Sequence, residues 1–246
     1  MTDQLPSIAT ASVAELGGRT SVLTRQRDDH IELDQLLHEL GETPAADRAD
    51  VLNRICRLVF PHAFAEESVL WPAIRKWVPD GESLTLEIER EHQEINELFS
   101  TLEEKGHGTD EGSALLDRIV VLLREDVRDE EDRLFPMLRR AMDDAQLRRL
   151  GLAWTAVRRT APTRPHPVVA RRPPGNVVAA LPLTMLDRSR DALDVVSRRV
   201  TTPSTVQLLQ RTSGLLATVA GAVEHVPPLT RGEDPSTRSG RTTRPE

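Results

Sequence analysis

The stretch DVRDEEDRLFP, residues 126–136, joins five acidic residues to an apolar end, Leu-Phe-Pro. A second stretch, HAFAEESVLWP at residues 62–72, has the same order of residue types, displaced by 64 positions. In each stretch, a ligand-type residue and the first glutamate are four residues apart, which places both on one face of a helix. A leucine eight residues after the first position continues that face, so these polar groups point toward a core, where they need partners. The two stretches therefore predict two helices of one bundle with polar groups in its interior.

Residues 20–143 contain four segments in which apolar residues recur at intervals of three and four, as in amphipathic helices. Glycine or proline ends each of the first three segments, and the loops between them are short. We therefore expect an all-α fold, an up-down-up-down four-helix bundle, followed by a fifth helix and a C-terminal helical extension. We also expect a kink at Pro61, because an interior proline removes a backbone hydrogen bond. The four segments are residues 21–40, 45–78, 82–105 and 111–142.

The charge of the chain changes sign along its length, which indicates two regions of different character. Residues 1–145 hold 32 acidic and 16 basic side chains, whereas residues 146–246 hold 7 acidic and 16 basic ones, all of the latter arginine. Prolines in APTRPHPVVARRPPGN, from residue 161, exclude a helix there. The expected order is a flexible N-terminus at 1–19, the bundle at 20–143, an additional helix at 144–160, a Pro/Arg-rich linker at 161–175, a C-terminal helical hairpin at 176–226 and a disordered tail at 227–246.

Composition limits the class of protein. No run of about 18 uncharged apolar residues is present, and the N-terminus lacks the pattern of a secretory signal, so we expect no membrane span and a cytoplasmic location. The single cysteine, Cys56, cannot form an internal disulfide, fits a reducing compartment and is expected in the core. The arginine-rich region lacks lysine and interleaved aromatic residues, which argues against binding of nucleic acid. The arginine-rich region is therefore expected to bind either an acidic protein partner or the acidic bundle itself.

The other two helical segments each place a histidine near their apolar stripe, in DDHIELDQLL and in EREHQEINELF. Together with the two i, i+4 pairs, they give each helix of the bundle at least one ligand-type group. A metal ion is one of the few partners that satisfy several carboxylates and imidazoles at once, and the core of a bundle can hold two ions bridged by carboxylates. The candidate metal ligands are His30, His62, Glu66, His92, Asp126 and Glu130.

Other polar residues are predicted to lie outside this set. The acidic neighbours in the two stretches lie off the core face, and we expect them to face water or to support the ligands without binding metal themselves: Glu67, Asp129, Glu131 and Asp132. Four histidines sit at a helix surface, in a loop, in the linker and at a helix end, and we expect no metal role for them: His38, His107, His166 and His225.

With these motifs in this order, the sequence resembles the hemerythrin-like HHE cation-binding family, a four-helix bundle with a non-haem di-iron centre. The motifs DH, HAFAEESVLWP, EHQEI and EEDRLFP carry the resemblance and fall within residues 20–143. The resemblance implies two iron ions (Fe²⁺/Fe³⁺) joined by carboxylate and oxo or hydroxo bridges. It implies that Glu66 and Glu130 bridge the ions, and that His30, His62 and His92 are further ligands.

The sequence departs from the family's pattern at two positions. Asp126 stands where the family has its fourth-helix histidine, and a carboxylate there makes the site more anionic. This change favours ferric iron, shifts selectivity toward manganese, or weakens one of the two metal positions. Asn96 stands where oxygen-carrying hemerythrins have a second histidine in the third helix, which argues against a five-histidine oxygen carrier.

Two functions remain open from the sequence. The first is a cytoplasmic di-iron protein that binds, senses or turns over a small diatomic or peroxide ligand (oxygen, nitric oxide or hydrogen peroxide), or that senses iron. The alternative is a regulatory or scaffold protein with a degenerate metal site, which acts through its arginine-rich C-terminal region. Asp126 keeps the alternative open, and whether the protein is an enzyme is left undecided.

Overall fold

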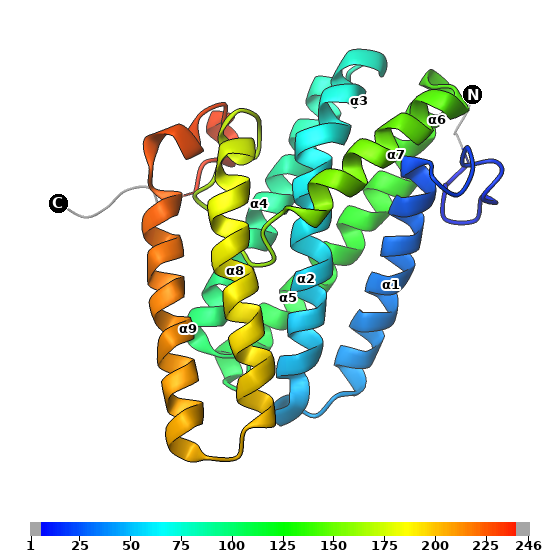
Figure 1. Cartoon of the computed structure of the whole chain (residues 1–246). Helices are drawn as coiled ribbons and strands as arrows, with labels where there is room; N and C mark the ends of the chain where they lie inside the picture. Colours follow the sequence, from blue (N-terminus) through cyan, green and yellow to red (C-terminus); the bar gives the residue numbers. More distant parts are fainter. Residues whose placement is uncertain (1–5, 240–246) are drawn as a thin grey trace.

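The computed structural model describes residues 6–239, and this part of the chain is an all-α helical bundle without strands (Figure 1). The helices run up, down, up and down as the sequence predicts, and the second and fourth are each built from two α segments. Additional helices follow the bundle. The bounds are α1 Val22–Glu42, α2 Arg48–Ala65, α3 Trp71–Trp77, α4 Gly81–Lys105, α5 Asp110–Asp129, α6 Phe135–Ala141, α7 Asp144–Arg159, α8 Gly175–Arg199 and α9 Pro203–Glu224.

The second and fourth helices each contain one π-helical turn. Glu66–Leu70 joins α2 to α3, and Glu130–Leu134 joins α5 to α6. Proline follows shortly after each turn, and because it has no N–H it cannot continue the i→i−4 ladder of an α-helix. The departure from α geometry thus lies at these turns, whereas Pro61 lies inside α2, which continues to Ala65. Single π turns of this kind are frequent at functional sites.

Two apolar clusters occupy the two ends of the bundle. Ile55, Phe60, Phe99 and Leu123 belong to one of them. Leu23, Trp71, Ile74 and Phe135 belong to the other. On every helix of the bundle, the ligand-type residues lie where the chain passes from one cluster to the other. The bundle therefore has a polar layer enclosed by apolar packing on both sides.

The helix α7 crosses α1 and α2 and closes the bundle at this layer (Figure 1). It begins with a capping box, in which Asp143 and Gln146 each bond the other's backbone N–H. Gly151 permits a close approach to the start of α1, since a Cβ there would collide with the carbonyl oxygen of Thr20. The approach brings Trp154, which is fully buried, against the polar layer.

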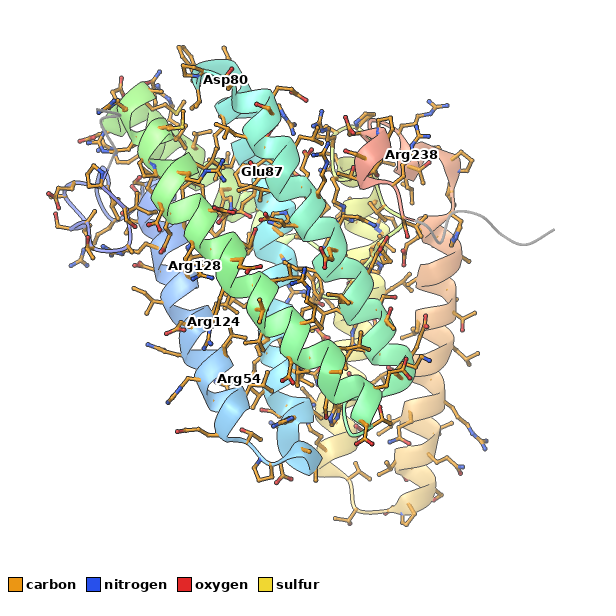
Figure 2. All side chains as sticks on the ribbon, turned by 180° about the vertical axis from the view of Figure 1, so that it is seen from behind. Arg54, Asp80, Glu87, Arg124, Arg128 and Arg238 are labelled. Atoms are coloured by element: carbon orange, nitrogen blue, oxygen red, sulfur yellow. The ribbon has the colours of Figure 1, made fainter. Side chains whose placement is uncertain are left out.

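The outer faces of α1, α4 and α5 carry exposed charges, several of which are labelled in Figure 2. Arg124 and Arg128 stand on the exposed side of α5, and Glu87 of α4 lies 3.2 Å from Arg133. At the turn into α4, Asp80 adopts a left-handed conformation with φ of 56°. These charges face solvent and need no further partner, unlike the carboxylates that point into the bundle.

Two terminal segments differ from the sequence-based expectation. Ile8 and Leu16 are buried in the apolar cluster beside α7, and the Ile8 N–H donates to the carbonyl oxygen of Glu131. Residues 227–239 form two 3₁₀ turns that bury Leu229 and Thr237. The expected flexible N-terminus and disordered tail therefore do not hold for residues 6–19 and 227–239, because apolar side chains there find packing partners. The rest of both expectations, residues 1–5 and 240–246, lies outside the described residues.

The arginine-rich region packs against the acidic bundle, one of the two partners that the sequence left open. Residues 161–174 are non-helical, as expected, but most of them are buried. Their charge is matched by the bundle because unpaired buried cations would be costly. The ion pairs are Arg164–Glu103 at 3.2 Å, Arg171–Glu67 at 3.7 Å and Arg172–Glu89 at 2.8 Å.

The helices α8 and α9 form a hairpin beside α2 and α4 (Figure 1). Arg57 of α2 and Arg190 of α8 make ion pairs across this boundary, with Asp191 and Glu103 respectively. The hairpin has an apolar cluster of its own, made of residues from 169 onward. Among the described residues, no helix is long and apolar enough to cross a membrane.

We expect a chain of residues 1–160 to fold into a helical bundle that binds metal. Both apolar clusters of the bundle draw only on residues up to 157, so their packing survives the deletion. The deletion removes the arginine partners of Glu67 and Glu103 and one of the two arginine partners of Glu89, so the melting temperature should fall. Circular dichroism melting and metal analysis measure both effects. An insoluble or metal-free product would show that the C-terminal helices complete the core.

Candidate metal centre

The structure brings all six candidate ligands together in the polar layer. Their ligand atoms form two overlapping groups, and within each group the atoms lie within 4.8 Å of one another. The first group is His30, His62, Glu66 and Glu130, and the second is His92, Asp126 and Glu130. Glu130 belongs to both groups. The Asp126 side chain is 13% exposed, more than any other of the six, yet its Oδ1 atom is buried.

The Nε2 atoms of the three histidines all face carboxylate oxygens. Glu66 presents Oε1 to His62 Nε2 at 3.0 Å and Oε2 to His92 Nε2 at 3.7 Å. Its two oxygens therefore point toward different histidines, as in a carboxylate that bridges two ions. The other contacts are His30 Nε2 to Glu130 Oε2 at 3.2 Å and His92 Nε2 to Asp126 Oδ1 at 3.5 Å.

Each histidine is held from behind by another carboxylate at its Nδ1 atom. The pairs are His30–Glu131 at 2.9 Å, His62–Asp29 at 2.9 Å and His92–Glu67 at 3.0 Å. An Nδ1–H that donates to a carboxylate leaves the Nε2 lone pair free, and this arrangement orients the imidazoles of metal sites. All three lone pairs would then point into the same space.

Glu67 and Glu131 are buried and bonded to candidate ligands, so of the two expectations for them the supporting role is confirmed and exposure to water is wrong. Each is the second residue of a π turn, and a π turn places more residues on one side of the helix than an α turn does. Both glutamates of each Glu-Glu pair therefore reach the interior. Asp132 is exposed, as expected, and Asp129 is half-buried, with 36% of its side chain exposed. The sequence offered the doubled glutamates as a signal, but α-helical spacing assigned the second one to the wrong face.

Sequence reasoning also missed Asp29, whose partner lies on another helix. Its neighbour His30 was noticed, but the contact of Asp29 with His62 depends on how α1 packs against α2. His166, for which no metal role was expected, lies outside both ligand groups. It is buried and bonded to Asp187 at 3.0 Å and Glu224 at 2.9 Å, which ties the segment before α8 to both helices of the hairpin.

Aromatic rings enclose the centre. Trp71 stacks on His92 at a centroid distance of 6.1 Å, and Phe135 stacks on His30 at 6.2 Å. These two rings occupy the same position, directly before the proline, in the two related stretches. Trp154 of α7 meets His62 edge-on at 5.5 Å. The rings exclude water, which strengthens electrostatic interactions among the enclosed groups.

The protonation of the enclosed groups reflects crowded negative charge. Burial opposes a charged imidazolium, yet the carboxylates Glu130 and Glu131 raise the pKa of His30 to about 9. The carboxylates of Glu66 and Asp29 likewise outweigh burial and raise the pKa of His62 to about 10. For Glu130, burial and the charges of neighbouring carboxylates raise the pKa to about 8. The centre therefore attracts positive charge, and a metal ion would replace the protons on its ligands.

The donor set fits iron or manganese. With the proton of each histidine on Nδ1, three buried carboxylate oxygens accept no hydrogen bond: Glu66 Oε1, Asp126 Oδ1 and Glu130 Oε1. Buried carboxylate oxygens without donors are costly, and a cation in the space between them would supply the missing partner. A mixture of imidazole nitrogens and carboxylate oxygens suits first-row metals of this kind.

A cavity of about 20 Å³ lies beside the centre, between the histidines and the first apolar cluster. Leu33, Val59, Ile95 and Leu123 form its apolar wall, and the space is sufficient for one water-sized molecule. Asn96 also lines it, but its Nδ2 donates to the carbonyl oxygen of His92 at 3.0 Å, as suits a structural residue. The arrangement can hold metal ions with a small ligand next to them.

Comparison with protein families gives one match. Residues 21–138 match the family model described as hemerythrin HHE cation binding domain. The match contains all six candidate ligands and ends before α7. Comparisons with curated proteins and with solved structures gave no match.

Proposed function

We propose that this protein holds a non-haem di-iron centre that binds, senses or turns over a small ligand, and the match of residues 21–138 to the hemerythrin HHE cation binding domain supports the proposal. Oxygen, nitric oxide and hydrogen peroxide are ligands of suitable size and chemistry. The observation that carries the proposal is the convergence of three imidazole Nε2 atoms and three buried carboxylates in one enclosed layer. The lone cysteine and the reduced state of such a centre both suit the cytoplasm.

The two groups of ligand atoms support a division of roles. His30 and His62 would hold one ion, His92 and Asp126 the other, and Glu66 and Glu130 would bridge them. Asp126 makes the second position richer in oxygen and more anionic than the first, so the two positions are not equivalent. Manganese is the alternative metal, because oxygen donors suit it well. Iron bound there would supply reversible one-electron chemistry and an open coordination position.

The chain's own residues would perform three tasks. Asp29, Glu67 and Glu131 keep the proton on Nδ1 of each histidine, so that Nε2 is available as a ligand atom. The aromatic rings around the histidines exclude water. The cavity would accommodate a small ligand, and its size would exclude larger molecules. Binding, sensing and turnover share these requirements and differ in what supplies or removes electrons.

The alternative, a regulatory or scaffold protein, receives less support. This alternative requires that Asp126 prevent metal binding at the centre and that the arginine-rich region be free to bind a partner protein. Asp126 turns its Oδ1 atom inward, and arginines of that region, among them Arg164 and Arg172, are engaged with the protein's own acidic bundle.

We expect about two metal ions per chain, mainly iron, after expression in iron-replete medium, because two overlapping ligand groups share one bridging glutamate. Elemental analysis of freshly purified protein, combined with its optical spectrum, measures this. Expression with manganese alone provides the comparison for metal preference. Less than about half an equivalent of any transition metal would count against the proposal, since a site of this kind retains its metal through purification.

A further inference from the structure

We propose that the segment after the matched domain completes the metal centre. Arg158 of α7 and Arg171, between α7 and α8, would act as positioning residues for His62 and His92, each through a carboxylate: the half-buried Asp29 and the buried Glu67. Both arginines lie beyond residue 138, where the family match ends. The metal-bound measurement below rests on the proposed function. The metal-free measurement depends only on contacts within the protein.

The first connection runs from α7 to His62. Arg158 Nη2 lies 3.0 Å from Asp29 Oδ2, and the same oxygen lies 2.9 Å from His62 Nδ1. The guanidinium carbon of Arg158 also sits 5.3 Å from the centroid of the Trp154 ring, whose edge-on partner is His62. Arg158 is therefore fixed by an anion and by an aromatic face that both contact the same histidine.

The second connection runs from the segment before α8 to His92. Arg171 Nη1 lies 3.7 Å from Glu67 Oε1, and that oxygen lies 3.0 Å from His92 Nδ1. Arg171 is buried, and its Nη2 donates to the carbonyl oxygens of His166 and Val169 at 2.9 and 3.0 Å. A cation held in this way cannot swing out to solvent. Burial of its charge is costly unless a nearby carboxylate, here Glu67, compensates it.

The expected effect on a bound metal follows from charge. A carboxylate that accepts from Nδ1–H makes the imidazole a stronger donor, and a cation on its far side weakens this effect. The same positive charge disfavours the more highly charged ferric state. Arg158 and Arg171 should therefore raise the reduction potential of the centre and hold the two imidazoles in place.

The metal-bound measurement compares Arg158→Gln and Arg171→Gln with Arg164→Gln. Arg164 is a matched control, since it is also buried and paired, but its carboxylates, Glu103, Asp191 and Asp194, contact none of the candidate ligands. In iron-loaded protein, each of the first two changes should favour ferric iron about tenfold, which lowers the midpoint potential by about 59 mV. Lysine at either position should restore most of the potential, and Arg164→Gln should leave it unchanged. Wild-type potentials in both glutamine variants would overturn the proposal.

The metal-free measurement uses the imidazole Nδ1–H signals in ¹⁵N-resolved NMR spectra. Arg171→Gln should shift or broaden the signal of His92, Arg158→Gln that of His62, and Arg164→Gln neither. Unchanged signals in the first two variants would overturn the positioning role, whether or not the protein binds iron. Shifted signals in a protein that takes up no iron would refute the proposed function alone.

Stability of the variants does not block the test. Arg158 is 30% exposed at its side chain, so Arg158→Gln leaves Asp29 accessible to water and is expected to fold. If Arg171→Gln fails to fold, Arg158→Gln decides the proposal by itself. An unchanged His62 signal in that variant would then refute it.

Discussion

In Glu66→Ala, we expect the metal content to fall from about two ions per chain to below about one, with a large drop in melting temperature. Glu66 is fully buried, and its two oxygens face His62 and His92, so its removal affects both metal positions. A metal that binds only the folded state stabilises it by about 2.7 kcal/mol when its free concentration is 100 times Kd. Elemental analysis and scanning calorimetry of the same preparation would record both losses together.

His62→Ala should act in the same direction. It removes a ligand of one position, so metal content is expected to fall less than in Glu66→Ala. The vacated space beside Trp154 adds a packing loss to the loss of metal. Chelation of metal from the wild-type protein should reproduce the part of the melting shift that comes from the metal.

Glu89→Ala is the matched control for Glu66→Ala. Glu89 is equally buried and charged, but it pairs with Arg75 and Arg172 at a place away from the candidate ligands. We expect it to lower the melting temperature while both metal ions stay bound. If Glu66→Ala kept full metal content and an unchanged melting temperature, Glu66 would not be a ligand.

The second large effect is expected at Asp126. Asp126→Ala should lower metal content by about one ion per chain, because Asp126 contributes to one of the two ligand groups and not to the other. Its Oδ1 atom is buried, accepts no hydrogen bond and lies 3.5 Å from His92 Nε2. Elemental analysis checks the stoichiometry, and retention of two ions would contradict a ligand role.

Asp126→His should keep both ions and change their properties. A nitrogen donor replaces an oxygen donor, so the optical spectrum should change. A neutral imidazole replaces an anion, so the reduction potential should rise. Asp129→His, three residues later on the same helix, is the control: Asp129 is paired with Arg133 and 36% exposed at its side chain, so its replacement should leave spectrum and potential alone. If the two variants had the same optical spectrum and reduction potential, Asp126 would not be a metal ligand.

The sequence by itself determined the helices and the candidate ligands of this protein. Spacing of apolar residues at three and four located the bundle helices to within a few residues, because that periodicity directly reflects which face is buried. The i, i+4 pairs His62–Glu66 and Asp126–Glu130 were readable for the same reason, since residues one turn apart share a face whatever the helix packs against. The resemblance to a family then supplied the expectation of iron and of bridging glutamates.

Tertiary structure decided everything that depends on contacts between elements distant in the chain. The burial of Glu67 and Glu131 required the π turns, whose widened geometry the α-helical periodicity does not contain. The contact of Asp29 with His62 required the packing of α1 on α2. Arg158 and Arg171 reach the carboxylates beside the centre only because α7 and the following segment fold back over the bundle. A pattern within one helix shows which side faces inward, but which partner meets it there is set by long-range packing and by the requirement that buried charges be paired.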